Sequence, residues 1–246
     1  MIQPLSHCDI EHHAVLFGLM AKRVIEACPE TGVDVIRRGV RAYGTERGKR
    51  MAERCLAHGD PLTPENYQIY NERSSKPGQM NSVPAEQLPE FVIHVKKCAW
   101  VDAWSAHGLL DYGKYYCLDI DRSLTNGFSS GYEVKIGGWL SWGSEYCDMH
   151  WGFPMDDACK ARIAEKKASF ADHVVKTYDY HTGHMFSTVG VTIVRELGDD
   201  GVAAVKLALA DFIAAFGREY VLAFAAAYAP LPAIERIIGE LLADRP

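Results

Sequence analysis

The amino-acid sequence predicts an α+β fold, in which a small antiparallel sheet and a central helix are flanked by N- and C-terminal helical segments. Helical spacing of apolar residues dominates both ends of the 246-residue chain, whereas alternating strand patterns are confined to its middle. Hydrophobic residues make up 48% of the chain and charged residues 24%, a balance typical of a globular protein with a substantial core. We therefore expect a single domain that covers residues 1–246.

The N-terminal helical segment covers residues 1–72. Helical patterns run from about residue 9 to residue 28 and again from residue 33 to residue 54. Gly44 and Gly48 are four residues apart on the second of these helices, so they allow another helix to approach closely. The many arginines and lysines of this helix are most simply explained as a solvated surface.

Residues 73–89 are rich in serine, proline and other polar residues, which predicts a loop or lid without secondary structure of its own. The α/β core follows at residues 90–153. Its patterns predict a strand at 91–96, a helical turn at 101–107 and a longer helix at 109–124. A strand at 132–136, a turn at Gly143-Ser144 and a partner strand at 145–152 complete an antiparallel hairpin.

The last segment, residues 154–246, is again helical. Its apolar helices suit a homo-oligomer interface as well as an internal core. Shifting the first segment by 169 residues aligns His12 with His181 and Phe17 with Phe186. A duplicated helical pair would give this pattern, but two amphipathic segments also match by chance, and both interpretations stay open.

Charge and composition narrow the class of partner. The net charge of −6 and the pI near 5.9 argue against binding to a nucleic-acid backbone, which needs a basic surface. Charged residues interrupt the most apolar stretch, 202–230, so we expect no membrane span. No secretory signal pattern is evident, and seven cysteines without a CxxC motif favour reduced thiols. We expect a cytoplasmic protein whose partner is a small-molecule substrate.

Cys117 and Asp121 form the first candidate catalytic pair. They are four residues apart on the predicted helix 109–124 and therefore share one face. A deprotonated cysteine attacks an electrophilic carbon, and a nearby carboxylate handles the proton. A carboxylate alone raises the pKa of a thiol, so a cation or a helix N-terminus would also be needed. Alternatively, Cys117 is a small buried residue and Asp121 a surface charge.

Cys147 and His150 lie on opposite faces of the last predicted strand. If the apolar residues of the 132–136 strand face the core, Cys147 joins them and His150 lies with Glu133 and Lys135. The two residues then serve one reaction centre only if a bulge intervenes. Trp100 and Trp104 are four residues apart, and such a pair more often lies in the core than forms a wall that stacks on a ligand.

Two groups of histidines and aspartates lie near the start of the first helix and near its repeat. They are His7, Asp9, His12 and His13, and Asp179, His181 and His184. These residue types bind metals, but the sequence contains no HExxH or other strong zinc motif, so capping and surface roles are simpler. No phosphate-binding glycine loop and no GxSxG motif is present. We therefore expect no metal and no cofactor.

Several short motifs follow one another in a defined order. They are Tyr43-Gly44-Thr-Glu-Arg47-Gly48, Cys98-Ala-Trp100, Gly108-Leu109, Tyr112-Gly113, Tyr116-Cys117, Asp121, Gly127-Phe128, Leu140-Ser-Trp-Gly143 and Tyr146-Cys147. In this order they resemble the L-2-amino-thiazoline-4-carboxylic acid hydrolase family. The likeness covers about residues 10–153, and the helical tail from Asp156 lies outside it.

The resemblance implies hydrolytic opening of a small thiazoline ring that bears an amidine-like C=N bond and a carboxylate. Water or a thiolate would add to the ring carbon between nitrogen and sulfur. The resemblance implies Cys117 as the nucleophile and Asp121 as the proton-handling group, with Cys147 nearby. The residues expected to bind the substrate are Trp100, Tyr112, Tyr116, Asn126 and His150.

The leading hypothesis is a hydrolase that acts on carbon–nitrogen bonds of a cyclic amidine or amide through a cysteine. Two other classes stay open. A small-molecule-binding or sensor module would hold the ligand tightly without forming product. A metal-dependent hydrolase that uses the histidine groups would lose its activity on chelation.

Overall fold

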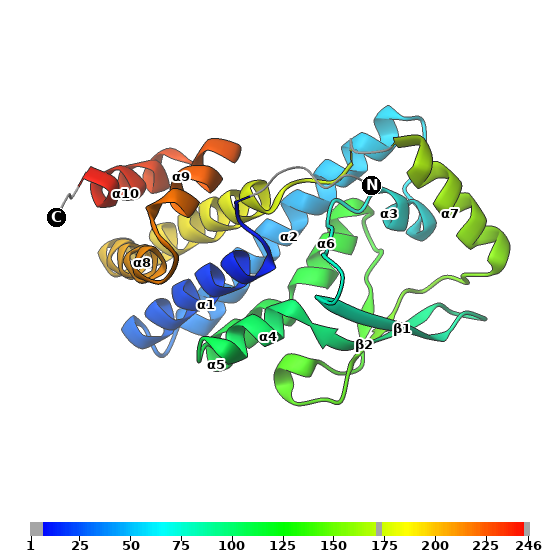
Figure 1. Cartoon of the computed structure of the whole chain (residues 1–246), viewed down its shortest axis with the longest axis horizontal. Helices are drawn as coiled ribbons and strands as arrows, with labels where there is room; N and C mark the ends of the chain where they lie inside the picture. Colours follow the sequence, from blue (N-terminus) through cyan, green and yellow to red (C-terminus); the bar gives the residue numbers. More distant parts are fainter. Residues whose placement is uncertain (1–6, 171–173, 244–246) are drawn as a thin grey trace. The chain divides into compact units, whose positions relative to one another are not determined.

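A computed structural model describes residues 7–170 and 174–243 (Figure 1). The chain forms two compact units, each built from separate stretches of sequence. The sheet unit contains Gly44–Ala99 and Asp119–Lys176. The helical unit contains the described residues up to Tyr43, then Trp100–Leu118, and the described residues from Thr177 onwards. These limits differ from the predicted segment boundaries at residues 72, 89 and 153, and the single-domain assignment stays a prediction.

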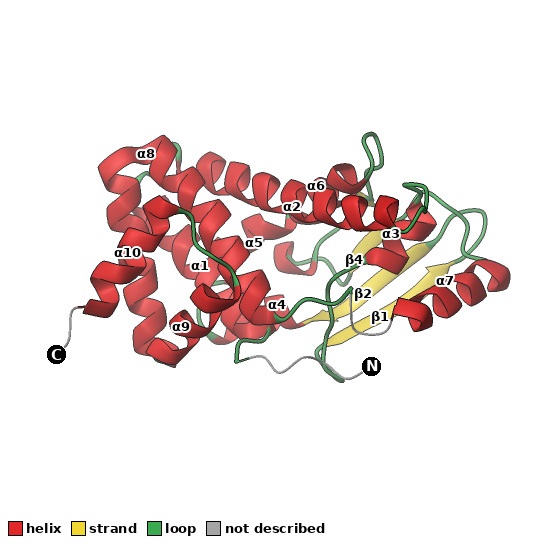
Figure 2. Ribbon diagram, turned by 90° about the horizontal axis from the view of Figure 1, so that it is seen from above, coloured by secondary structure: helices red, strands yellow, loops and turns green. Residues whose placement is uncertain are grey.

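The sheet confirms the predicted α+β class. Its strands within the described residues are β1 (Met80–Glu86), β2 (Val92–Cys98), β3 (Lys135–Ile136) and β4 (Cys147–His150), in the antiparallel order β1-β2-β4-β3. β1, β2 and β4 lie side by side in Figure 2. β3 and β4 form the predicted hairpin, with the 3-10 helix η1 (Leu140–Trp142) between them.

Helices cover one face of this sheet and supply the core of the unit. They are the C-terminal part of α2 (Gly32–Ala57), α3 (Pro64–Tyr70), α6 (Ile120–Phe128) and α7 (Asp157–Phe170). The core contains aromatic side chains from helices and sheet, among them Tyr67, Tyr70, Phe128 and Trp151. Large aromatic side chains bury much apolar area each, so they stabilise a core of modest size.

The prediction that residues 73–89 lack secondary structure is wrong, because β1 lies within this range. β1 pairs with β2 at the edge of the sheet. It is largely exposed, contains Pro84 and has two register irregularities against β2. These features are typical of edge strands that avoid pairing with other chains, and they hide the strand from pattern analysis.

The predicted central helix at 109–124 is also wrong, because it is two helices. α5 covers Leu110–Cys117 and α6 covers Ile120–Phe128. Asp119, just before α6, has φ −124° and ψ −26°, which breaks the regular helix. Cys117 therefore ends α5 in the helical unit, whereas Asp121 lies in the first turn of α6 in the sheet unit. Cys117 and Asp121 therefore do not share the face of one helix, and this prediction is wrong.

The predicted role of Gly44 and Gly48 in close helix approach is confirmed. A Cβ atom added to Gly48 would overlap the carbonyl oxygen of Leu124 on α6. From the other side, a Cβ atom on Gly127 of α6 would lie 2.5 Å from the carbonyl oxygen of Thr45. α2 and α6 thus cross with their backbones in contact, which only glycine permits at these positions.

Three arginines of α2 surround a buried carboxylate, so the assignment of this helix's basic residues to a solvated surface is wrong for them. Glu72 is 0% exposed, and Arg50 binds its two oxygens at 2.8 Å each. Arg47 Nε and Arg54 Nη1 lie 4.0 and 3.8 Å from the same carboxylate. This ionic cluster ties α2 to the segment that follows α3.

The helical unit contains α1 (Ile10–Ala27), the first part of α2, α4 (Ala99–Ala106), α5, α8 (Tyr178–Phe216), α9 (Arg218–Ala227) and α10 (Pro232–Ala243). α1 packs along α8 (Figure 1). α8 breaks at Gly198, with φ 56° and ψ −129°, and this residue aligns with Pro29 in the 169-residue shift. The repeat stays a prediction. Over the described ranges, no helix has the length and apolarity needed to cross a membrane.

Replacement of Gly48 with alanine should lower the free energy of unfolding by about 2 kcal/mol or more. Overpacking costs about 1–3 kcal/mol, and here the added methyl group meets backbone that has no rotamer to change. Urea titration measures the effect. Gly239→Ala on α10 is the control, because a Cβ atom there meets nothing within 4 Å. Equal stability of the two variants would contradict the close crossing.

Replacement of Glu72 with glutamine should lower the free energy of unfolding by about 3–5 kcal/mol, because the three arginines lose the counter-charge of a fully buried carboxylate. Glu196→Gln is the control, since Glu196 pairs with the exposed Arg38 and should contribute less than about 1 kcal/mol. Chemical denaturation of both variants gives the comparison. Similar losses of unfolding free energy in the two variants would show that the buried cluster stabilises the fold no more than an exposed ion pair.

Candidate active site

Asp121 is partly buried in the sheet unit, where it interacts electrostatically with two arginines and a tyrosine. Burial raises the pKa of its carboxyl group, and the positive charges of Arg73 and Arg47 lower it by less, so the net shift is upward. Burial also raises the pKa of the Tyr67 phenol, and the charge of Asp121 adds to that shift. A carboxyl group perturbed in this way is a candidate for proton transfer.

The strand register places Cys147 on the core face of the sheet. Cys147 lies opposite Val95, and the next residue on that face, Met149, lies opposite Ile136. Successive residues of a strand alternate between faces, so His150 points to the other side of the sheet. This arrangement agrees with the face assignment made from the sequence.

A bulge in β2 brings a second thiol to the core face. The register of β1 against β2 skips Lys96, so the strand returns Cys98 to the face that carries Val95 and Cys147. The strand register therefore explains why Cys98, the first residue of the Cys98-Ala-Trp100 motif, faces the core.

The thiol of Cys147 is protonated at neutral pH. Burial raises its pKa to about 11, and the charges of Cys98 and Asp121 contribute to the rise. The backbone N–H of Leu140 donates to Sγ at 3.3 Å and lowers the pKa by a smaller amount. Cys147 and Asp121 are thus electrostatic neighbours within one unit, and the thiol needs a base before it can attack.

Two other predicted site residues of the sheet unit lie apart from this pair. Asn126 is exposed, and its side-chain oxygen accepts the N–H of Gly131, so it shapes the turn after α6. His150 lies on the outer face of the sheet, where it contacts Asp148 and Glu90. None of these contacts of Asn126 and His150 involves Asp121.

The remaining predicted site residues belong to the helical unit. Cys117 is partly exposed at the end of α5, and Tyr112 is partly buried on the same helix. Trp100 is buried and its Nε1 donates to Nδ1 of His13 at 3.4 Å. Tyr116 is buried and packs edge-on against Phe17. The structure therefore gathers Asp121 and Cys147 in one unit and these four residues in the other.

The histidine groups act in capping and packing. Asp9 caps α1 and exchanges hydrogen bonds with His12, while Asp179 accepts the backbone N–H groups of His7 and Cys8. His13, His181 and His184 are buried among tyrosines and Trp100. In the described part of the chain, no three His, Cys, Asp or Glu side chains are arranged to hold a metal ion.

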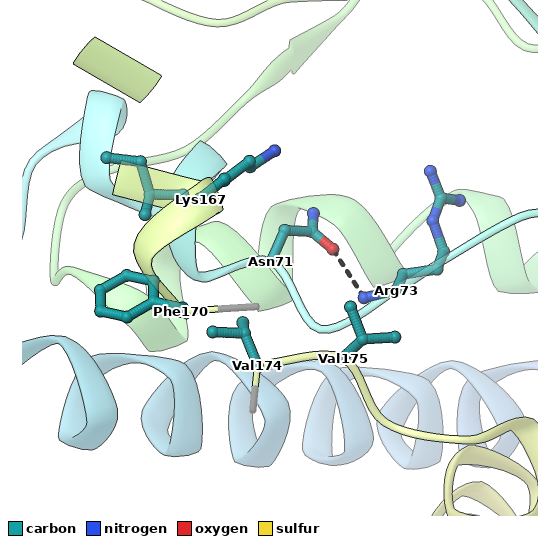
Figure 3. A pocket seen from close by; sticks show the side chains of 7 residues that line it. Asn71, Arg73, Lys167, Phe170, Val174 and Val175 are labelled. Carbon is teal, nitrogen blue, oxygen red and sulfur yellow. Dashed lines mark hydrogen bonds between the residues drawn. The ribbon is translucent and has the colours of Figure 1, made fainter. Parts of the chain in front are cut away.

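A small cavity lies in the sheet unit beside α7 (Figure 3). Its volume is about 70 Å³, enough for a few water molecules or a short ligand. Apolar side chains such as Phe170 and Val174 form one wall, and Asn71 and Lys167 lie at the polar end. Figure 3 shows the guanidinium group of Arg73 directed away from the apolar wall.

Sequence reasoning missed three residues that act on Asp121 or Cys147. Arg47 lies between Gly44 and Gly48 in a recognised motif, but it was counted with the surface charges. Cys98 opens another motif, and only the bulge in β2 reveals which face it occupies. Arg73 stands in the polar stretch predicted to be a loop, and no local pattern marks it.

Fold and candidate site together define an α+β protein whose sheet unit carries a carboxyl group of raised pKa, two guanidinium groups and two thiols. The family described as L-2-amino-thiazoline-4-carboxylic acid hydrolase matches residues 8–151, more than half of the chain. The chain belongs to this family, and the family name supports a hydrolase. Searches of curated proteins and of solved structures gave no significant match.

The outer face of the sheet carries a charged cluster centred on His150. Its Nε2 lies 3.2 Å from Asp148 and its Nδ1 lies 3.4 Å from Glu90, so only the protonated ring donates to both carboxylates. Desolvation lowers the pKa of His150, but the two carboxylates raise it by more. Asp148 also lies 3.4 Å from His94 of β2, and Lys135 is opposite His150 on β3.

This cluster should make stability depend on pH. The pKa of His150 is higher in the folded state than in the unfolded state, so its contribution is complete below about pH 6.5 and is lost as the pH rises through the folded pKa. The difference in unfolding free energy between wild type and His150→Gln should therefore be smaller at about pH 8 than at about pH 6, because a histidine loses its charge in this range. Glu90→Gln should weaken this trend, and a pH-independent difference would contradict it.

Proposed function

We propose that this chain opens a small carboxylate-bearing heterocycle by hydrolysis at an amidine-like carbon, with Asp121 and Cys147 as the reacting groups. The observation that carries the proposal is the desolvated Asp121 carboxyl group, which has arginine charges and a thiol as its electrostatic neighbours in a member of a thiazoline-carboxylate hydrolase family.

The charge pattern of the site complements a dipolar ring. An amino-thiazoline carboxylate carries a negative carboxylate and a positive amidinium group when the ring is protonated. Arg47 and Arg73 would bind the carboxylate, because guanidinium groups bind carboxylates through paired hydrogen bonds. Asp121 would face the amidinium group. Such a substrate stabilises the ionised carboxylate of Asp121, whose pKa is raised in the free protein.

The reaction then proceeds in two stages. The Cys147 thiol gives its proton to the Asp121 carboxylate as sulfur adds to the ring carbon, and the C=N electron pair moves to nitrogen. One ring bond at that carbon breaks, and Asp121 returns the proton to the leaving atom. Water next adds to the same carbon, the bond to Cys147 breaks, and the thiol is restored. One water molecule is consumed for each ring opened.

Cys147 is a better nucleophile candidate than Cys117. Cys147 has Asp121 within electrostatic range and a backbone N–H on its sulfur. Cys117 ends α5, and the C-terminal end of a helix disfavours a thiolate. The sequence-based choice of Cys117 therefore gives way to Cys147 in the proposal.

Loss of ring absorbance of L-2-amino-thiazoline-4-carboxylate, followed over time with purified protein, tests the proposal. Cys147→Ser and Asp121→Asn should each lower kcat by at least about a hundredfold, because each removes a group that acts in the chemical step. Cys117→Ser is the matched control and should stay within about threefold of wild type.

The other outcomes are equally decisive. Full activity of Cys147→Ser with loss in Asp121→Asn would indicate direct attack by water, with Asp121 as the base. Loss of activity only in Cys117→Ser would return the nucleophile to α5. Tight binding of the ring by wild type without product would favour a binding or sensor module.

A further inference from the structure

Ser141 is an unusual residue of the sheet unit. It is 3% exposed, and its hydroxyl group has no hydrogen-bond partner among the described residues. Buried hydroxyl groups nearly always have a partner, because a group taken out of water without one costs free energy. Alanine would occupy this position without that cost, so the hydroxyl group calls for an explanation.

The turn that carries Ser141 is held against the sulfur of Cys147. Ser141 is the middle residue of η1, and the preceding residue, Leu140, donates its backbone N–H to Cys147 Sγ at 3.3 Å. η1 also packs against β2, the strand that ends at Cys98. Ser141 thus directly follows Leu140, the residue whose backbone N–H contacts the sulfur of the candidate nucleophile Cys147.

The backbone around Ser141 is well fixed. The N–H groups of Trp142 and Ser144 both donate to the carbonyl oxygen of Trp139, at 3.0 and 3.1 Å. Gly143 closes the turn at φ 88°, a conformation that favours glycine. A fixed turn keeps the Ser141 hydroxyl group buried inside the protein.

We infer that Ser141 contacts the substrate, and that its hydroxyl group hydrogen-bonds a nitrogen substituent on the carbon that Cys147 attacks. This inference rests on the proposed function. A bound ring would supply the partner that the free protein lacks, so binding converts an unfavourable buried group into a hydrogen bond. Ser141 then determines specificity, because a ring without that nitrogen leaves the hydroxyl group unsatisfied.

Replacement of Ser141 with alanine tests the inference through two opposite effects. The variant should unfold at the same or a higher Tm, because a buried unsatisfied hydroxyl group is removed. Its kcat/KM for L-2-amino-thiazoline-4-carboxylate should fall about tenfold, the usual effect of one lost hydrogen bond. A residue with a purely structural role would change both quantities in the same direction.

Ser187→Ala is the matched control. Ser187 is 1% exposed on α8 of the helical unit, and its hydroxyl group also lacks a partner among the described residues. The control should show the same change in Tm as Ser141→Ala, with unchanged kcat/KM. Equal losses of activity in the two variants would overturn the inference.

A second comparison tests the contact itself. Calorimetry compares Cys147→Ser with the double variant Cys147→Ser/Ser141→Ala, so that the ring is not opened during the titration. The same ring lacking its exocyclic amino group should bind both proteins equally, whereas the amino-substituted ring should bind more tightly to the protein that keeps Ser141. Wild-type kcat/KM in Ser141→Ala would overturn the inference and leave the proposed function standing. If wild type does not turn the ring over, the proposed function fails. The inference about Ser141 is then judged by calorimetry alone. Equal affinity of both proteins for the amino-substituted ring, or no binding to either, overturns it.

Discussion

The close crossing of α2 and α6 is the constraint on which the candidate site depends. Gly44, Gly48 and Gly127 let the two backbones touch, so any side chain at these positions would separate the helices. Arg47 lies between the two glycines of α2, and Asp121 lies in the first turn of α6. The crossing therefore sets how strongly an arginine charge acts on the Asp121 carboxyl group. The glycines that allow the two helices to pack closely thus also influence the pKa of Asp121.

The Glu72 cluster supports this arrangement by balancing charge inside the sheet unit. Arg47 contributes to two environments, since it lies 4.0 Å from Glu72 and also acts on Asp121. Burial of Asp121 outweighs the attraction of its arginines, and its pKa rises. A carboxylate that is fully stabilised by arginines would be a poor base. Desolvation raises the pKa of Asp121 above its ordinary value, which favours its capacity to accept and return a proton.

The sequence predicted the fold class, the hairpin of β3 and β4 and the helix contact at Gly44 and Gly48, because each leaves a short periodic pattern. It failed where tertiary contacts override local patterns. β1 looks like a polar loop because an edge strand has little apolar surface, and one residue with irregular φ and ψ, Asp119, divides the predicted central helix. Within the site, Arg73 was unpredictable, since its relation to Asp121 exists only in the folded chain.

The choice between thiols shows how strand register decides chemistry. Cys147 occupies the core face because the pairing of β2 with β4 sets Val95 opposite it, and a shift by one residue would exchange it for Asp148. The same register sends His150 to a charged cluster outside. With a pKa of about 11, the Cys147 thiol stays protonated and unreactive toward adventitious electrophiles at neutral pH. In the proposed reaction only a ligand that leaves Asp121 ionised beside it activates the sulfur, so the burial that lowers the intrinsic reactivity of Cys147 also confers selectivity on it.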